Sequence, residues 1–89
     1  MKQRGERPIL CVRREEGDAV FRYQVAVNDA TPSEYSVYAE YKDSTRYTVG
    51  EIPHFSTDRD TAESFCGMLD RFRVTPLSLE AIYEDMYTP

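Results

Sequence analysis

The sequence predicts an α+β fold: a four-stranded antiparallel β-meander followed by a C-terminal two-helix hairpin packed on one sheet face. Four stretches rich in tyrosine, valine and isoleucine come first and are separated by short turn signals. Two segments with apolar residues at helical spacing follow them, joined at Val74-Thr75-Pro76. Strands that precede helices, instead of alternating with them, are typical of the α+β class.

The length and composition of the chain predict one small domain. Its 89 residues are 40% hydrophobic and 30% charged, which is ordinary for a globular protein. We expect a single domain over 1–89, with a flexible segment at 1–7, a sheet at 8–55 and a helical hairpin at 57–87. Seven tyrosines suit half-buried sheet faces, because a tyrosine ring packs while its hydroxyl reaches water.

The first three strands are expected at residues 9–14, 19–27 and 34–42. In the second and third, apolar and polar residues alternate, which indicates one covered and one wet face of the sheet. The covered face is expected to take Ala19, Phe21, Tyr23, Val25, Val27, Tyr35, Val37, Ala39 and Tyr41. Tyr38 is expected on the other face.

The fourth strand is expected to begin at Thr45, with Tyr47 and Val49 also on the covered face. The next apolar residue, Ile52, does not continue that alternation. A β-bulge at Gly50-Glu51 would restore the inward direction of Ile52. Pairing should fade beyond Pro53, which has no N–H to donate.

Two helices are expected after the sheet. Thr57 with Asp60 resembles a capping box at the start of the first helix. Thr75 suits the N-cap of the second helix and Pro76 its first position. The apolar stripes of the two helices are Ala62, Phe65, Cys66, Leu69 and Phe72, then Leu79, Ile82, Tyr83 and Met86. We expect the hairpin to pack on the sheet through Phe65, Leu69, Leu79 and Ile82.

The net charge of −5 is unevenly distributed along the chain. Residues 1–50 hold eight basic and eight acidic side chains, whereas residues 51–89 hold three basic and eight acidic ones. An acidic helical part repels the phosphate backbone of nucleic acids. The first fourteen residues are basic, which leaves open an arm that binds nucleic acid.

The residues able to carry chemistry do not form a known pattern. Cys11 lies in an apolar run and Cys66 on the apolar stripe of the first helix, so both are expected to be buried, reduced thiols. His54 is the single histidine and has no companion at metal-site spacing. We therefore expect no catalytic residue, metal or cofactor, and no enzymatic activity.

Three segments together resemble a family of small bacterial proteins that is classed only as a domain of unknown function. They are Tyr35-Ser36-Val37-Tyr38-Ala39, Val49-x-x-Ile52 and Val74-Thr75-Pro76-x-x-Leu79-x-x-Ile82-x-x-Asp85. The resemblance covers about residues 19–87 and departs from the family pattern at Ser36 and Pro53. It implies a bacterial, cytoplasmic protein and brings no activity, cofactor or site.

The sequence favours a protein-interaction or regulatory module. Glu80, Glu84 and Asp85 form an acidic outer face on the last helix, which suits a basic protein partner, and Tyr38 is a second candidate contact. The alternative is a nucleic-acid-binding module that uses the strand face and the basic arm, and an enzyme ranks last. We expect a cytoplasmic protein with a protein partner, neither nucleic acid nor membrane as a partner, and leave a homodimer open.

Overall fold

A computed structural model of the chain describes residues 6–28 and 33–87. The described elements are β1 (Glu6–Glu16), β2 (Ala19–Asn28), β3 (Glu34–Lys42), β4 (Tyr47–Ser56), α1 (Arg59–Phe72) and α2 (Pro76–Tyr87). The strands pair antiparallel in the order β1-β2-β3-β4, so the predicted meander and the α+β class are confirmed. Of the segment 1–7 that was expected to be flexible, residues 6 and 7 belong to β1, and residues 1–5 lie outside the described residues.

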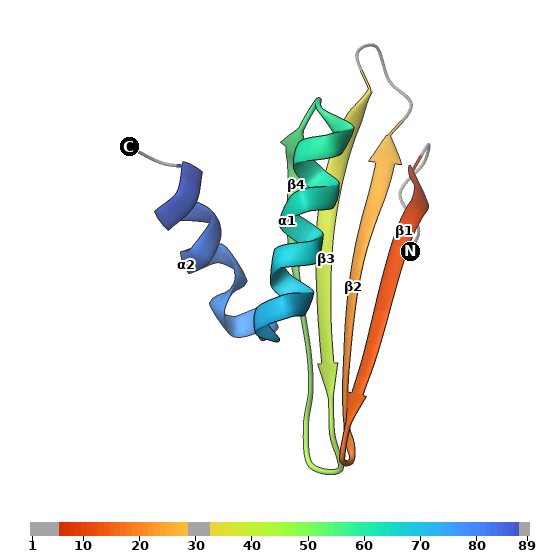
Figure 1. The fold of residues 1–89 in the computed structure, drawn as a ribbon, viewed down its shortest axis with the longest axis vertical. Coiled ribbons are helices and arrows are strands. Elements are labelled where there is room, and N and C mark those ends of the chain that lie inside the picture. Colours follow the sequence, from red (N-terminus) through yellow and green to blue (C-terminus); the bar gives the residue numbers. More distant parts are fainter. Residues whose placement is uncertain (1–5, 29–32, 88–89) are drawn as a thin grey trace.

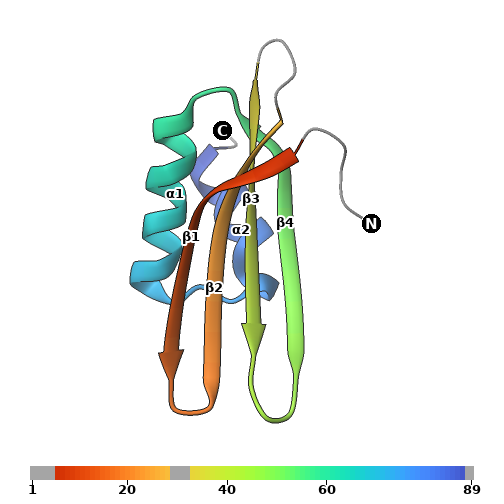
Figure 2. The same cartoon turned by 90° about the vertical axis from the view of Figure 1, so that its right-hand side faces the viewer.

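Both helices lie on the same side of the sheet (Figure 1). α1 packs mainly across β2 and β3, and α2 packs mainly on β4. Figure 2 shows the opposite side, where the sheet stands in front of both helices. We call this opposite side the open face. The end of the sheet that carries the β1–β2 and β3–β4 turns projects beyond the helices (Figures 1 and 2).

The core lies between the helices and the covered face of the sheet. Three of the four residues expected to hold the hairpin are buried, since Phe65, Leu69 and Leu79 are at most 2% exposed, and Ile82 is partly buried against them. Their sheet-side partners are Phe21, Tyr23, Val25, Val37, Ala39, Ile52 and Phe55. The alternation in β2 and β3 therefore predicted the covered face, because successive strand side chains point to opposite sides.

The expected orientation of β4 was wrong. Tyr47 and Val49 are 58% and 63% exposed, on the open face, because the strand pairs Gly50 with Ala39 on the covered face. A side chain at position 50 would bring its Cβ within 3.1 Å of the carbonyl oxygen of Pro76. Glycine therefore suits the place where the start of α2 meets the strand, because a side chain there would have to displace Pro76 by a few tenths of an ångström.

The bulge also lies later than expected. The register is continuous from Tyr47 to Ile52 and shifts only between Ile52 and Ser56, so pairing resumes beyond Pro53. His54, inside the shift, has a φ of 54°, in the left-handed region that non-glycine residues rarely adopt. Pro53 is tolerated because β4 is an edge strand.

Two residues of the expected apolar stripes are exposed. Phe72 is the last residue of α1 and is 65% exposed, with the guanidinium of Arg71 5.9 Å from its ring centre. Met86 is 53% exposed in the last turn of α2, where the helix diverges from the sheet (Figure 1). The helical spacing of apolar residues therefore extends beyond the part of each helix that packs on the sheet.

The first helix is capped by Asp58, not by the Thr57–Asp60 capping box. The Asp58 carboxylate accepts a hydrogen bond from the backbone N–H of Thr61 at 3.0 Å. α2 begins at Pro76 as expected, and the contact at its start is made by the Thr75 carbonyl, which accepts from the Ser78 N–H at 3.0 Å. α1 ends where Arg73 adopts the left-handed conformation and Val74 N–H bonds back to the Leu69 carbonyl.

Replacing Asp58 with alanine is expected to lower the melting temperature by about 4–8 °C at pH 7. Hydrogen bonds from Thr61 lower the pKa of Asp58 below its ordinary 3.8 in the folded chain. The stabilisation is therefore present above pH 3.8 and is lost as the pH falls below that value. Thermal melts of both proteins should converge at acid pH; a constant difference from neutral to acid pH would contradict the cap.

Candidate functional site

The open face of the sheet is covered by neither helix (Figure 2). Its side chains come from alternate positions of all four strands, and they include Cys11, Arg13, Arg22, Gln24, Tyr38, Glu40, Lys42, Tyr47, Val49 and Glu51. Tyr38 lies there as predicted and is half-buried. Tyr47 and Val49 lie on the same face as Tyr38, because Gly50 of β4 lies on the covered face and successive side chains alternate. The face therefore combines exposed apolar groups with polar ones.

The open face is hollowed at two adjoining places. The larger hollow, about 750 Å³, lies toward the end of the sheet that carries the two turns, and Arg13, Val20, Lys42 and Tyr47 contribute to its lining. The smaller, about 220 Å³, is lined in part by Gln24, Tyr38 and Val49. Arg22 and Glu40 line both hollows, which therefore adjoin, and we call the two together the concave region.

Glu40 organises the centre of this concave region. Arg22 lies directly opposite it on β2, and its guanidinium Nη1 is 2.7 Å from the Glu40 carboxylate. The hydroxyl of Tyr47 donates to the same carboxylate at 2.5 Å. This hydrogen bond raises the pKa of Tyr47, so its hydroxyl stays protonated as a donor. Three strands thus hold one charge-neutral cluster on the face.

Asp43 fixes the rim of the larger hollow. Its carboxylate accepts from the backbone N–H groups of Thr45 and Arg46, both at 2.8 Å, and from the hydroxyl of Tyr41 at 2.6 Å. The Tyr41 bond is the main cause that lowers the pKa of Asp43. An aspartate that bonds its own following backbone is typical of a rigid turn. The end of the concave region is therefore preformed.

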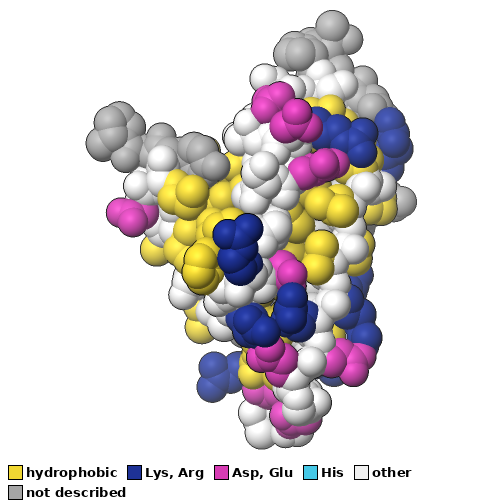
Figure 3. All heavy atoms as spheres, viewed as in Figure 1, with side chains coloured by type: hydrophobic (Ala, Val, Ile, Leu, Met, Phe, Trp, Pro, Cys, Tyr) yellow, Lys and Arg dark blue, Asp and Glu magenta, His cyan; other side chains and the backbone are white. Residues whose placement is uncertain are grey.

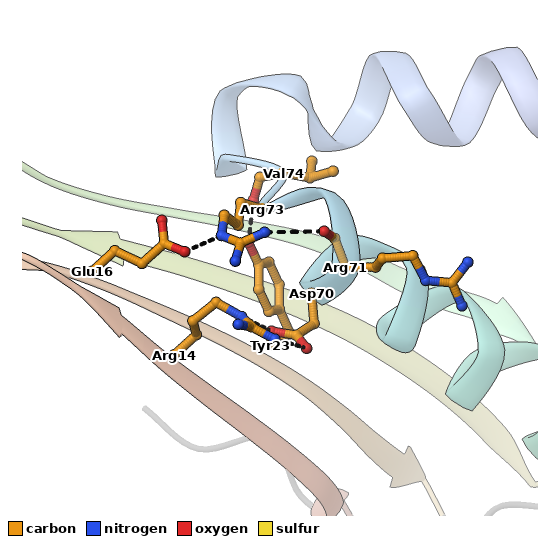
Figure 4. A network of polar contacts seen from close by, with 7 residues as sticks. All are labelled: Arg14, Glu16, Tyr23, Asp70, Arg71, Arg73 and Val74. Atoms are coloured by element: carbon orange, nitrogen blue, oxygen red, sulfur yellow. Dashed lines mark hydrogen bonds and ion pairs between the residues drawn. The ribbon is translucent and has the colours of Figure 1, made fainter.

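A second polar cluster lies on the covered side, where the end of α1 meets β1 and β2 (Figure 4). The guanidinium of Arg14 makes two bonds of 3.0 Å to the Asp70 carboxylate, and this pairing lowers the pKa of Asp70. Arg73 pairs with Glu16 beside it. The Arg14–Asp70 ion pair is bidentate, and both pairs join α1 to β1, which indicates a structural role in fixing α1 on the sheet.

The predicted partner-surface residues do not form one surface. Glu80, Glu84 and Asp85 are exposed on α2, which packs on the covered side, whereas Tyr38 belongs to the open face. Figure 3, which views the helix side, shows apolar side chains gathered around α2. Leu77 is 76% exposed in the first turn of that helix.

His54 and Cys66, two of the residues able to carry chemistry, are also apart. His54 is on the outside of β4, with its Nδ1 2.6 Å from a Glu34 carboxylate oxygen, and its side chain is 67% exposed. Cys66 is 0% exposed in the core, and burial raises the pKa of its thiol to about 12. The ring of His54 therefore contacts Glu34 at the surface, while the thiol is enclosed and protonated. Within residues 6–28 and 33–87, no three His, Cys, Asp or Glu side chains are grouped to hold a metal ion.

One family model matches the sequence over residues 8–89, that of a family of unknown function, DUF6514. The chain belongs to DUF6514. This confirms the predicted relationship to a family without an assigned function, over a longer segment than residues 19–87. No curated protein and no solved structure matches the chain. Among its described residues, no helix is long and apolar enough to cross a membrane.

Sequence reasoning missed two groups in this DUF6514 chain. Tyr47 and Val49 were assigned to the core because their spacing matches that of core residues in the neighbouring strands. The usable signal was Gly50, since a glycine in a strand often marks close approach of another backbone. Cys11 was expected to be buried but is exposed, because β1 is an edge strand and its apolar run supplies both faces.

The two thiols are expected to differ sharply in reactivity. Cys11 is exposed on the open face, and Cys66 is buried with a pKa raised to about 12. A thiol reagent at pH 8 should modify one equivalent rapidly in native buffer and the second only on unfolding. Peptide mapping should place the fast label on Cys11. Rapid labelling of Cys66 in native protein would contradict the packing of α1 on the sheet.

Proposed function

We propose that this DUF6514 member is a protein-interaction module of the bacterial cytoplasm that binds its partner through the open face. The observation that carries the proposal is the preformed concave region that holds Tyr38, Tyr47 and Val49 around a neutral Arg22–Glu40 pair. Tyrosine is enriched in protein interfaces, because its ring supplies contact area and its hydroxyl a directional bond. The free thiols of Cys11 and Cys66 fit a reducing compartment.

The charges of the open face support a protein partner over a nucleic acid. Among its described side chains, the basic Arg13, Arg22 and Lys42 are fewer than the acidic Glu15, Glu34, Glu40 and Glu51. Arg13 pairs with Glu15, and Arg22 with Glu40. Affinity for nucleic acid depends on cations that replace condensed counterions around phosphates. Cations that are already paired with carboxylates are poorly suited to replacing the counterions around phosphates.

The acidic face of α2, which the sequence favoured as the partner-binding surface, is the second candidate for that surface in this proposal. Glu80, Glu84 and Asp85 are exposed on a convex helix surface, whereas the open face offers a hollow with apolar groups inside it. Specific interfaces need a well-packed, desolvated centre, which a convex acidic surface lacks. The partner is expected to present an apolar side chain flanked by polar groups.

Affinity capture from an extract of the source organism, with matched variants of the bait, tests the proposal. A protein retained by the wild-type chain should be lost with Tyr38→Ala and kept with Glu84→Gln. Both variants should melt within about 4 °C of the wild type, because neither side chain is in the core. A retained protein lost with Glu84→Gln instead would assign binding to α2 and contradict the proposal.

A mobility-shift titration tests the nucleic-acid alternative. The net charge of −5 and the paired cations of the open face predict no binding to single-stranded RNA or DNA below about 10 µM at physiological salt. Sub-micromolar binding that weakens steeply with added salt, and that is lost with Tyr38→Ala, would establish the alternative on the same face.

A further inference from the structure

The outer edge of β4 carries free backbone hydrogen-bonding groups. At the β3–β4 turn, the Asp43 N–H donates to the Arg46 carbonyl at 2.9 Å, so these residues form a hydrogen-bonded pair. Bonded and non-bonded pairs alternate along an antiparallel ladder. In the continuous register that follows, Thr48 and Gly50 therefore bond to β3.

The alternate residues of β4 point the other way. Tyr47, Val49 and Glu51 direct their N–H and carbonyl groups to the side where the sheet ends, since β4 pairs only with β3 among the described strands. Figure 2 shows the middle of β4 at this side of the sheet with no other described element beyond it. An edge of this kind is a template for another strand.

Apart from the one charged side chain of Glu51, this stretch lacks the features that usually protect an edge strand. Natural edges carry lysine, proline or a bulge. β4 has its proline and its irregular segment only beyond Ile52. Between Tyr47 and Glu51 it exposes two apolar side chains, Tyr47 at 58% and Val49 at 63%. On the helix side, Pro76 lies against Gly50, and the next residue, Leu77, is 76% exposed.

The opposite edge of the sheet is protected. β1 has a register shift between Pro8 and Leu10, and its other half is the charged run Arg13–Glu16. Bulges and charges discourage strand addition. The two edges therefore differ, and β4 is the edge suited to pairing.

We propose that β4 pairs antiparallel with β4 of a second copy of this chain, about a two-fold axis at Val49. Tyr47, Val49 and Glu51 are the outward-bonding residues, and only this register pairs all three with one another. Val49 meets Val49 of the partner subunit, and Tyr47 lies opposite Glu51 of the partner subunit. The two four-stranded sheets become one continuous sheet, and the interface is isologous and closed.

The chemistry of the edge favours a second copy over a different partner. Tyrosine opposite glutamate lays an aromatic ring beside the aliphatic part of a longer side chain, while the Tyr47 hydroxyl keeps its bond to Glu40 of its own chain. The pairing buries Val49 against its own symmetry mate. The Tyr47–Glu51 contact arises twice and the Val49–Val49 contact lies on the axis, as a two-fold interface requires.

Charge reversal at the two-fold position tests the pairing. The purified chain, kept reduced, should sediment as a dimer within a range of about 1–200 µM. Val49→Lys and Val49→Glu should each weaken the dimer by about tenfold or more, because like charges then lie directly opposite. An equimolar mixture of the two variants should restore the dimer. Only a register that places residue 49 opposite itself predicts this rescue.

Matched controls keep the outcome interpretable. The same two substitutions at Ser64, which is exposed on α1, should leave self-association unchanged. Circular dichroism should show that all variants are folded, since residue 49 is largely exposed. A wild-type chain that is monomeric at about 200 µM, or a dimer unaffected by the Val49 variants, would overturn the proposal. The result is independent of partner binding by the open face, which Tyr38→Ala tests.

Discussion

Replacing Leu69 with alanine is expected to lower the free energy of unfolding by about 2–5 kcal/mol. Leu69 is 0% exposed in the last turn of α1, and its carbonyl accepts the bond from Val74 N–H that ends the helix. Alanine would remove buried methyl groups and leave a cavity that the surrounding sheet cannot fill. The loss is a large fraction of the stability of so small a domain.

Urea denaturation followed by circular dichroism measures this loss. Ser64→Ala, on the exposed side of the same helix, is the matched control and should change stability by less than about 0.5 kcal/mol. A denaturation midpoint for Leu69→Ala within error of the wild type would contradict the placement of α1 on the sheet.

Replacing Tyr23 with phenylalanine is expected to cost about 1–3 kcal/mol, although a single oxygen atom is removed. Tyr23 is 0% exposed, and its hydroxyl donates to the carbonyl of Val74 at 2.7 Å. Figure 4 shows this bond reaching from β2 to the link between the helices. Phenylalanine would leave that carbonyl without its partner, which carries a desolvation penalty.

The same residue predicts a pH dependence. Burial raises the pKa of Tyr23 above the ordinary tyrosine value of 10.0. The unfolded chain ionises first, so this contribution to stability is complete below pH 10 and declines as the pH rises above it. Tyr23→Phe should lack the part of the alkaline decline that Tyr23 causes. Tyr47→Phe, which removes an exposed hydroxyl, is the control and should cost little at neutral pH. Equal effects of the two substitutions at neutral pH would contradict the buried bond.

The alternation and helical periodicity of this sequence were sufficient to predict its fold class, strand order and most of its core. These patterns are informative because each strand or helix buries one face, and Val25, Val37 and Leu69 lie on such buried faces. They failed where a contact between distant residues decides the outcome. Which side chains of β4 face the helices follows from the pairing of Gly50 with Ala39, beside which Pro76 packs, and no local pattern contains these contacts.

The candidate surface was predicted in part for the same reason. Tyr38 was placed correctly because its strand alternates clearly. Tyr47 and Val49 were not, because the spacing of β4 imitates a core strand. Cys11 was misplaced because an apolar run does not reveal which of its side chains an edge strand exposes. The exposure of Glu80 and Glu84 followed directly from helical spacing.

Amide hydrogen exchange along β4, measured by NMR, tests most directly the claim that β4 turns Tyr47 and Val49 to the open face and leaves its edge free to pair. In a dilute sample, the amides of Thr48 and Gly50 should exchange slowly, and those of Tyr47 and Val49 rapidly. In a concentrated sample, Tyr47 and Val49 should become protected as the second copy binds. Slow exchange of Tyr47 and Val49 at dilution, with rapid exchange of Thr48 and Gly50, would contradict both the register and the interface built on it.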